Sequence, residues 1–266
     1  MSTDSGAGDE DAAITLYRLH GCPYCERIVR RLERYGIPYR SRFVAGEHSR
    51  RDAVAREAGT RSVPVVVDHE RGVTMPESSR ILEYLERTYG DGGPTERSDS
   101  DGMELIEFPP AEHPTVGETA PEFTRPLVSA AYWEDTSLST LVEREGPVLL
   151  VFYPLNWGGK SVYWWGEIRD RSWHEDLTVV GVGIGQPFDH QRFIERHGLE
   201  NALYSDPGNG VAERYGVVHD LDGMTGVSEP RPATFLIGPE RTIDHVWIAD
   251  EWPPSPPYDE IESNWK

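Results

Sequence analysis

The sequence predicts an α/β protein made of two domains in tandem. Segments with the apolar pattern of buried strands alternate with segments of helical periodicity in both halves of the chain, and a stretch rich in Ser, Asp, Gly and Pro separates the halves. The length of 266 residues suits two domains of ordinary size. We expect a disordered acidic leader over residues 1–10, a first domain over 11–91, a linker over 92–113 and a second domain over 114–262.

The composition indicates a soluble, acidic protein. No apolar run approaches the ~20 residues of a membrane span, and the first ten residues lack the basic and apolar pattern of a signal peptide. We therefore expect a cytoplasmic protein that does not associate with membranes. With 46 acidic and 26 basic residues, the net charge is −20. Nucleic acid is not an expected partner, because binding it relies on a basic surface.

Lysine is almost absent, since only Lys160 and Lys266 are lysine and the other basic residues are arginine. An acidic, lysine-poor surface is similar to that of proteins from salt-accumulating halophiles. Charge repulsion of this size is long-ranged, and it is largely screened at ~1 M salt, where the Debye length is about 3 Å. We expect a halophilic protein that gains thermal stability in molar KCl. The alternative is an ordinary acidic protein.

In the first domain the pattern predicts the order β-α-β-α-β-β-α. Apolar runs predict strands over 13–19, 39–44, 63–67 and 73–75, with a hairpin turn at 69–72. Helical spacing predicts helices over 23–35, 49–58 and 78–89, which Gly36, Gly59 and Gly90 terminate.

The only two cysteines lie in the run His20-Gly21-Cys22-Pro23-Tyr24-Cys25, between the first strand and the first helix. A strand, a Gly turn and Cys-x-x-Cys at a helix start is the layout of a thiol–disulfide site. The unpaired N–H groups and the positive dipole end of a helix favour a thiolate, so Cys22 is predicted to be the nucleophile with a lowered pKa. Cys25, one turn further on, would resolve the mixed disulfide.

This run also allows two other interpretations. Cys22 and Cys25 could form half of a zinc site, but the sequence offers no second pair of cysteines and its histidines are scattered, so no metal is predicted. Arg18 and His20 are nearby cationic groups, and we interpret them as incidental strand-end residues.

This part of the chain resembles the glutaredoxin family and the related N-terminal domain of glutathione S-transferases. The resemblance rests on Cys22-Pro23-Tyr24-Cys25, Ser62-Val63-Pro64, and Pro76-Glu77-Ser78-Ser79 followed by Ile81-Leu82. It implies a thioredoxin fold in which Pro64 is the cis-proline and the backbone of Val63, with Tyr24, binds the thiol substrate. Glu77 and Ser78 would hold a γ-glutamyl group. The alternatives are a strand-edge proline and a plain N-cap at Ser78.

The implied co-substrate is a low-molecular-weight thiol, either glutathione or γ-glutamylcysteine, and no cofactor is expected to be bound. The implied macromolecular partners are disulfide-containing proteins.

In the second domain, strands are predicted over 147–153, 177–184, 234–237 and 242–248, and helices over 137–145, 159–172, 189–197 and 211–215. This order resembles the peroxiredoxin (AhpC/TSA, redoxin) family. The resemblance rests on the segments 116–123, 148–154, 205–207, 212–217 and 234–237. It implies a second thioredoxin fold.

The catalytic residues of that family are largely replaced in this chain. Of the family's Pro-x-x-x-Thr-x-x-Cys, Pro154 is kept, Gly158 stands at the threonine position and Ser161 at the peroxidatic cysteine position. The family's arginine falls on Pro232, with Arg231 one place away. Peroxide does not oxidise a serine hydroxyl, so we expect no peroxidase activity here. Trp157, Trp164 and Trp165 flank this site and either fill the core or form a docking surface.

Taken together, the sequence predicts two tandem thioredoxin folds and a glutaredoxin-like oxidoreductase that reduces protein or mixed disulfides through Cys22 and Cys25. The second domain would be a non-peroxidatic module. The alternative is a redox-regulated binding or adaptor protein in which the dithiol is a sensor.

Overall fold

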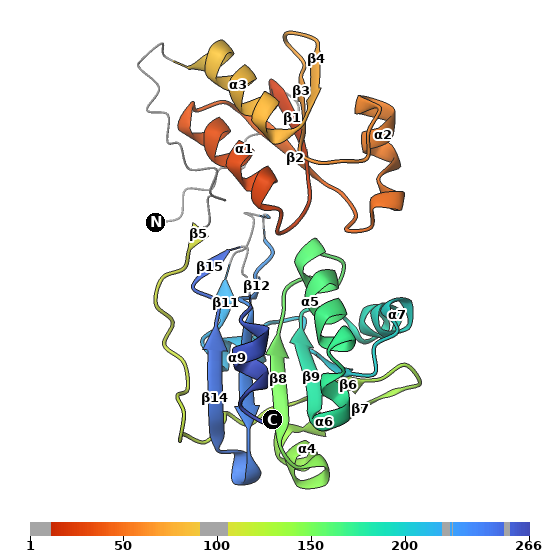
Figure 1. Cartoon of the computed structure of the whole chain (residues 1–266), viewed down its shortest axis with the longest axis vertical. Helices are drawn as coiled ribbons and strands as arrows, with labels where there is room; N and C mark the ends of the chain where they lie inside the picture. Colours follow the sequence, from red (N-terminus) through yellow and green to blue (C-terminus); the bar gives the residue numbers. More distant parts are fainter. Residues whose placement is uncertain (1–11, 91–105, 220–223, 225, 253–255) are drawn as a thin grey trace. The chain divides into compact units, whose positions relative to one another are not determined.

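The computed structural model describes residues 12–90, 106–219, 224, 226–252 and 256–266, and the chain divides into two compact units, 1–105 and 106–266 (Figure 1). Each unit is described by itself. The expected leader and residues 92–105 of the expected linker lie outside the described residues. Among the residues that are described, no helix has the length and apolar character needed to cross a bilayer.

The first unit has the predicted order of elements. These are β1 (Ile14–Arg18), α1 (Pro23–Arg34), β2 (Tyr39–Phe43), a 3₁₀ helix (His48–Arg50), α2 (Asp52–Ala58), β3 (Val65–Asp68), β4 (Val73–Pro76) and α3 (Ser78–Tyr89).

Its four-stranded sheet has the order β2-β1-β3-β4, with β1 and β2 parallel and the other pairs antiparallel. Helices α1 and α3 pack on one face around Leu16, Ile28 and Leu85, whereas α2 packs on the other face through Val54. All residues of β1 are buried, and neighbouring side chains lie on opposite faces of the sheet, with Leu16 in one core and Tyr17 in the other, as the two-residue period of a strand requires.

Two boundaries in this unit differ from the prediction by more than one residue. The helix expected over 49–58 is interrupted at Arg51, whose backbone (φ −92, ψ 45) is not helical, so that a short 3₁₀ turn precedes α2. The third strand begins at Val65 rather than at residue 63, because the Val63–Pro64 peptide lies ahead of the ladder.

The second unit is an α/β layer structure around a seven-stranded sheet of order β14-β13-β8-β9-β10-β6-β7. Its helices are α4 (Leu138–Glu145), α5 (Gly159–Asp170), α6 (Trp173–Asp176), α7 (Pro187–His197), α8 (Gly210–Arg214) and α9 (Tyr258–Glu262). Its strands are β5 (Ile106–Glu107), β6 (Thr124–Val128), β7 (Trp133–Ser137), β8 (Val148–Phe152), β9 (Thr178–Gly183), β10 (Ala202–Ser205), β11 (Val218–His219), β12 (Glu229–Pro230), β13 (Ala233–Ile237), β14 (Ile243–Ile248) and β15 (Glu251–Trp252).

Two cores cover the faces of this sheet. One contains α4 and α8, with Leu141, Phe152 and Phe235 among its buried residues. The other contains α5, α6, α7 and α9, with Trp165 and Phe193 at its centre. Every residue of β8 and β13 is buried, as expected for strands covered on both faces.

Several elements of the second unit carried no prediction. They are the β6–β7 hairpin, β10, α6, α9 and the short two-stranded sheets β11-β12 and β15-β5. The ordered chain also continues beyond residue 262, since Lys266 forms an ion pair with Asp176 at 3.2 Å.

Candidate active site

The dithiol lies where β1 ends and α1 begins. Cys22 is the N-cap of α1 in an extended conformation, and Pro23 is the first helical residue, which suits a position whose N–H has no partner in the helix. The Cys25 N–H donates to Cys22 Sγ over 3.4 Å. Both cysteines are free thiols, and Cys25 is fully buried whereas Cys22 is partly exposed. One sulfur is therefore accessible and the other is shielded.

The surroundings of the two thiols separate their acidities. A hydrogen bond with the Cys25 side chain lowers the pKa of Cys22 from 9.0 to about 7, against the opposing effect of burial, and the N–H groups of Cys25 and Tyr24 act in the same direction. Burial and the neighbouring Cys22 sulfur raise the pKa of Cys25 far above its ordinary value. Near neutral pH a large fraction of Cys22 is therefore thiolate, while Cys25 keeps its proton.

Arg18 contributes to this electrostatic environment. Its guanidinium is buried, forms an ion pair with the buried Glu26 at 3.2 Å and lies over the Phe43 ring at 4.9 Å. Its positive charge makes a minor contribution to the lowered pKa of Cys22. The interpretation of Arg18 as incidental was therefore too strong. Glu26, which the sequence analysis did not single out, holds this cation in place. His20 is buried as well.

The register of the sheet brings the other predicted residues to the same edge as Cys22. Tyr17, near the end of β1, pairs with Val65 at the start of β3, and Val65 pairs with Pro76 at the end of β4. The segments that contain Val63–Pro64 and Glu77–Ser78 therefore lie at the edge where β1 leads into Cys22. Segments far apart in the sequence thus meet at one edge of the sheet.

Three residues at this edge have unusual backbone geometry or exposure. Pro64 is buried and its peptide bond with Val63 is cis, while Tyr24 is 53% exposed beside Cys22. Glu77, not Ser78, is the N-cap of α3, with a positive φ of 74° and no capping hydrogen bond from its side chain. The alternative of a plain N-cap at Ser78 was therefore wrong.

Arg51 organises the loops on either side of the edge and was missed by the sequence analysis. Its guanidinium donates to the carbonyls of Ala45 at 2.8 Å, Gly46 at 2.7 Å and Arg61 at 3.2 Å. The chain after β2 and the loop ahead of Val63 are therefore tied together by one buried side chain. Its partners are backbone groups, so no residue pattern could have revealed it.

In the second unit, Ser161 lies in the first turn of α5 and is fully buried. Arg231 is also buried, and its guanidinium donates to the carbonyls of Ala249 and Pro109. Trp164 and Trp165 are almost completely buried, and Trp157 packs against Phe193 at 5.4 Å between ring centroids. These tryptophans therefore contribute to the core rather than to an exposed docking surface.

Across the residues that the structure describes, no group of three or more His, Cys, Asp or Glu side chains is arranged to hold a metal ion.

Comparison with known proteins assigns a family to each unit. Residues 16–95 match the glutathione S-transferase N-terminal domain, and residues 116–246 match the AhpC/TSA family. These matches confirm the two expected thioredoxin-type folds. A putative peroxiredoxin, bcp, of Coxiella burnetii is 30% identical over 139 residues, which are 50% of this chain and 87% of that protein.

Two solved structures are among those that resemble the chain. The peroxidoxin BcpB of Mycobacterium tuberculosis is 26% identical, with 51% of this chain and 86% of that chain covered and a TM-score of 0.44. A mutant of PrxQ from Xylella fastidiosa is 22% identical, with 57% of this chain and 94% of that chain covered and a TM-score of 0.44.

Proposed function

The chain belongs to the AhpC/TSA family of peroxiredoxins, and we propose that it is a glutaredoxin-type thiol–disulfide oxidoreductase. A domain of the glutathione S-transferase N-terminal type precedes the peroxiredoxin-like unit. Both families support a thiol redox role. The observation that carries the finer proposal is the pair of unequal thiols at the head of α1, with Cys22 acidic and accessible and Cys25 buried and protonated.

The proposed reaction is a dithiol exchange. The Cys22 thiolate attacks one sulfur of a protein or mixed disulfide, a Cys22–substrate disulfide forms, and the other sulfur leaves as a thiolate that takes up a proton. Cys25 then loses its proton and attacks Cys22 Sγ, which releases the second substrate thiol and leaves a Cys22–Cys25 disulfide. Two molecules of a small thiol return two electrons and two protons, and one small-molecule disulfide is produced.

The small thiol is proposed to carry a γ-glutamyl group, as glutathione and γ-glutamylcysteine do. The Val63–Pro64 segment precedes the first paired residue of β3, so its backbone groups lie outside the strand ladder and are available to a peptide-like substrate. The N-terminus of the twelve-residue helix α3, at Glu77 and Ser78, lies at the same edge and favours a carboxylate. Tyr24 would cover the bound thiol from the exposed side.

The test is disulfide reduction by the full-length protein at low and molar KCl, with hydroxyethyl disulfide as substrate and either glutathione or γ-glutamylcysteine as reductant. We expect turnover that is lost in Cys22→Ser. Cys25→Ser is expected to retain reduction of mixed disulfides but to lose most reduction of protein disulfides. Turnover that persists in Cys22→Ser would refute the proposal.

For the second unit we propose a scaffold without peroxidase activity, because residues 106–266 contain no cysteine and Ser161 is completely buried. Consumption of hydrogen peroxide should therefore be no faster with the Cys22→Ser, Cys25→Ser double variant than in buffer. Turnover in that variant would show that another residue reacts with peroxide.

A redox-regulated binding protein is the second candidate function, and one observation favours it. Trp133 and Phe188 form an exposed edge-to-face pair with ring centroids 4.8 Å apart, and Tyr132 beside them is 62% exposed. Exposed aromatic side chains are typical of protein interfaces. A partner retained in only one redox state, and lost in Trp133→Ser, would support this function if disulfide turnover is negligible.

A further inference from the structure

The last two residue pairs between β1 and β2 each join an arginine to an aromatic ring. β2 lies beside β1 at the edge of the first unit's sheet (Figure 1), and the register places Arg42 opposite Tyr17 and Phe43 opposite Arg18. The Arg42 guanidinium lies 5.4 Å from the centre of the Tyr17 ring, and the Arg18 guanidinium lies 4.9 Å from that of Phe43. Because neighbouring side chains of a strand point to opposite faces, one stack lies on each face of the sheet.

The two arginines differ in burial and in charge balance. Arg18 is 2% exposed, and Glu26 neutralises its charge at 3.2 Å. Arg42 is exposed, and its guanidinium donates to the Tyr17 hydroxyl at 2.7 Å. Within the described part of the chain, Arg42 has no carboxylate partner. Because Tyr17 is itself buried, its ring and hydroxyl hold a cation at the surface whose charge no carboxylate neutralises.

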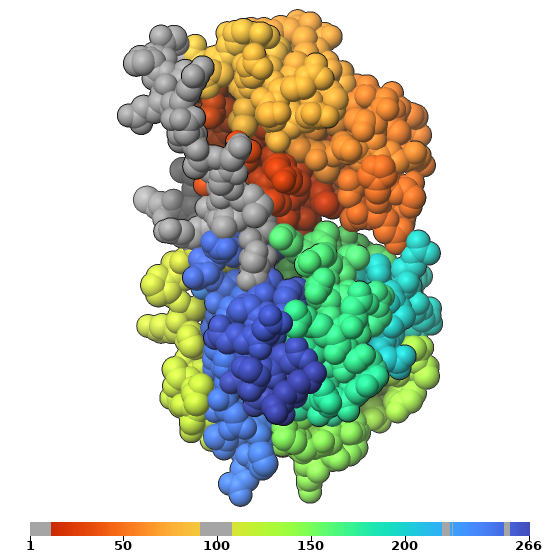
Figure 2. Space-filling view, viewed as in Figure 1, coloured from red at the N-terminus to blue at the C-terminus, as the bar shows by residue number. Residues whose placement is uncertain are grey.

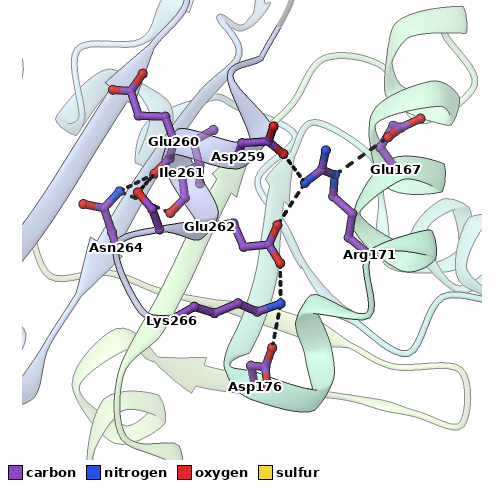
Figure 3. A network of polar contacts seen from close by, with 10 residues as sticks. Glu167, Arg171, Asp176, Asp259, Glu260, Ile261, Glu262, Asn264 and Lys266 are labelled. Atoms are coloured by element: carbon purple, nitrogen blue, oxygen red, sulfur yellow. Dashed lines mark hydrogen bonds and ion pairs between the residues drawn. The ribbon is translucent and has the colours of Figure 1, made fainter.

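An arginine of the second unit shows the contrasting, structural use of this side chain. Arg171 bonds Asp259 at 2.7 Å and Glu262 at 2.9 Å, and so joins the end of α5 to α9 (Figure 3). Figure 2 shows this C-terminal segment, in dark blue, packed on the surface beside the green residues of α5. Arg42 is held by an aromatic ring and a hydroxyl instead, so its charge is available to a molecule that binds from solvent.

The end of β2 lies close to the dithiol. Phe43 pairs with Arg18, the last residue of β1, and a turn closed by the Cys22 N–H and the Leu19 carbonyl at 3.2 Å leads from there to the nucleophile. Neighbouring strands lie about 4.8 Å apart and the ends of such a turn lie within about 7 Å of each other. The Cα atoms of Phe43 and Cys22 are therefore at most about 16 Å apart, a distance that about five residues of an extended peptide cover.

The exposed side chains at this place fit a protein substrate. Phe43 is 39% exposed beside Arg42, and aromatic rings and arginines are enriched at protein interfaces. A positioned guanidinium is well suited to bind a carboxylate. We propose that Arg42 and Phe43 form a docking site for the protein substrate, and that Arg42 selects disulfides with an acidic side chain within about five residues of the reactive cysteine. This selectivity rests on the proposed dithiol reaction and defines the class of protein disulfide that it reduces.

The test compares peptides that differ only in charge. Each peptide carries one cysteine, blocked as the mixed disulfide with 2-mercaptoethanol, and has either Glu or Gln at the positions within about five residues of it. The full-length protein reduces them at about 0.1 M KCl, where the Debye length is about 10 Å, with whichever of glutathione and γ-glutamylcysteine supports reduction of hydroxyethyl disulfide. We expect kcat/KM to be about twofold to fivefold higher for the Glu peptide, as one exposed ion pair allows.

Variants of Arg42 assign this preference to its charge. Arg42→Gln should remove the preference, and Arg42→Glu should reverse it in favour of a peptide with Lys at the same positions. Arg42→Lys keeps the charge and should keep the preference. The matched control is Arg34→Gln, which removes an exposed arginine at the opposite end of α1 from Cys22 and should leave the preference unchanged.

Equal kcat/KM for the Glu and Gln peptides in the wild type would overturn the inference, and so would a preference that survives in Arg42→Gln or disappears in Arg34→Gln. Reduction of hydroxyethyl disulfide by the wild type separates the two proposals, because that substrate is neutral and small. Its turnover without any preference among the peptides refutes only the docking site, whereas no turnover refutes the dithiol reaction and the docking site together. If Arg42→Gln does not fold by circular dichroism, the comparison of Arg42→Glu with Arg42→Lys decides.

Discussion

The buried His190 should make the second unit sensitive to mild acid. This side chain is completely buried on α7. Its Nε2 donates to the Tyr204 carbonyl at 3.2 Å, and its Nδ1 lies 3.1 Å from both the Tyr153 hydroxyl and Asn156 Oδ1. Burial lowers the pKa of His190 from 6.5 to about 4. The folded state therefore holds this ring in its neutral form.

The magnitude follows from the linkage between proton binding and folding. Below pH 6.5 the unfolded chain protonates His190 while the folded chain does not, so the free energy of unfolding decreases as the pH falls from 6.5 towards 4. The gap between 6.5 and about 4, at 1.36 kcal/mol per unit, corresponds to about 3 kcal/mol. Below pH 4 both states are protonated and the loss is complete. The stability that neutral His190 contributes is therefore fully present above pH 6.5.

Urea unfolding between pH 7.5 and 4, followed by tryptophan fluorescence, measures this effect, since all eight tryptophans lie in residues 106–266. His190→Gln keeps hydrogen-bonding groups but does not titrate. The variant is expected to be less stable at pH 7.5, yet to lose about 3 kcal/mol less than the wild type on acidification.

His245→Gln is the matched control, because burial also lowers the pKa of His245 but that side chain is only partly buried. It should flatten the pH dependence less than His190→Gln does. Equal pH dependence in the wild type and in His190→Gln would refute the assignment of the acid sensitivity to this ring.

Three further predictions concern the thiol site and the two cores. Alkylation of Cys22 by iodoacetamide should reach half its maximal rate near pH 7, and Cys25→Ala should move that midpoint upward, because the Cys25 side chain is the largest cause of the lowered pKa; an unchanged midpoint would contradict this cause. The buried carboxylate of Asp68 accepts hydrogen bonds from the hydroxyls of Tyr84 and Tyr89 at 2.7 and 2.6 Å, so Asp68→Asn should destabilise the first unit by about 1–3 kcal/mol. Hydrogen exchange of the β3 and α3 amides measures this loss, and unchanged protection would contradict the prediction. Gly181→Ala would place a Cβ 2.6 Å from Trp165 and Leu203 atoms, so it should lower the free energy of unfolding in urea by about 1–3 kcal/mol. In the control, Gly166→Ala in α5, the added Cβ meets no atom within 4 Å, so the free energy of unfolding should rise by up to about 1 kcal/mol. Similar effects of the two substitutions would refute the packing argument.

The elements that the sequence predicted correctly are those with strong local signals. The strand β8 is an unbroken apolar run, and α3 matches its predicted bounds because its apolar face is regular and Gly90 follows it. In contrast, β6 contains a proline and β7 consists largely of exposed polar residues, so their pairing depends on the neighbouring strand rather than on their own composition. Helix α9 has only five residues and is held by ion pairs from distant residues.

The same distinction applies to the candidate site. Cys22 and Cys25 were evident because both the chemistry and the helix start are local in sequence. The position of Val63 and Glu77 at the same edge as Cys22 depends on strand register. In the sequence, only the order of the three motifs pointed to this common position. Arg51 could not be predicted, since its three partners are backbone carbonyls that any residue supplies.

The distribution of charge bears on how the dithiol unit meets its substrate. Residues 12–90 contain 14 arginines and 10 acidic residues, whereas residues 106–266 contain 11 basic and 27 acidic residues. Among the residues that the structure describes, the acidic excess that motivates the halophile hypothesis is therefore concentrated in the second unit, although both lysines of the chain also lie there, and any gain in stability from salt should be concentrated in that unit. The arginine excess of residues 12–90 would attract an anionic γ-glutamyl thiol only at short range, because the chain as a whole carries a net charge of −20. At ~1 M salt that attraction is screened beyond about 3 Å. Under our proposal, recognition in molar salt should therefore depend on groups in direct contact with the thiol, such as the N-terminus of α3 and the backbone at Val63.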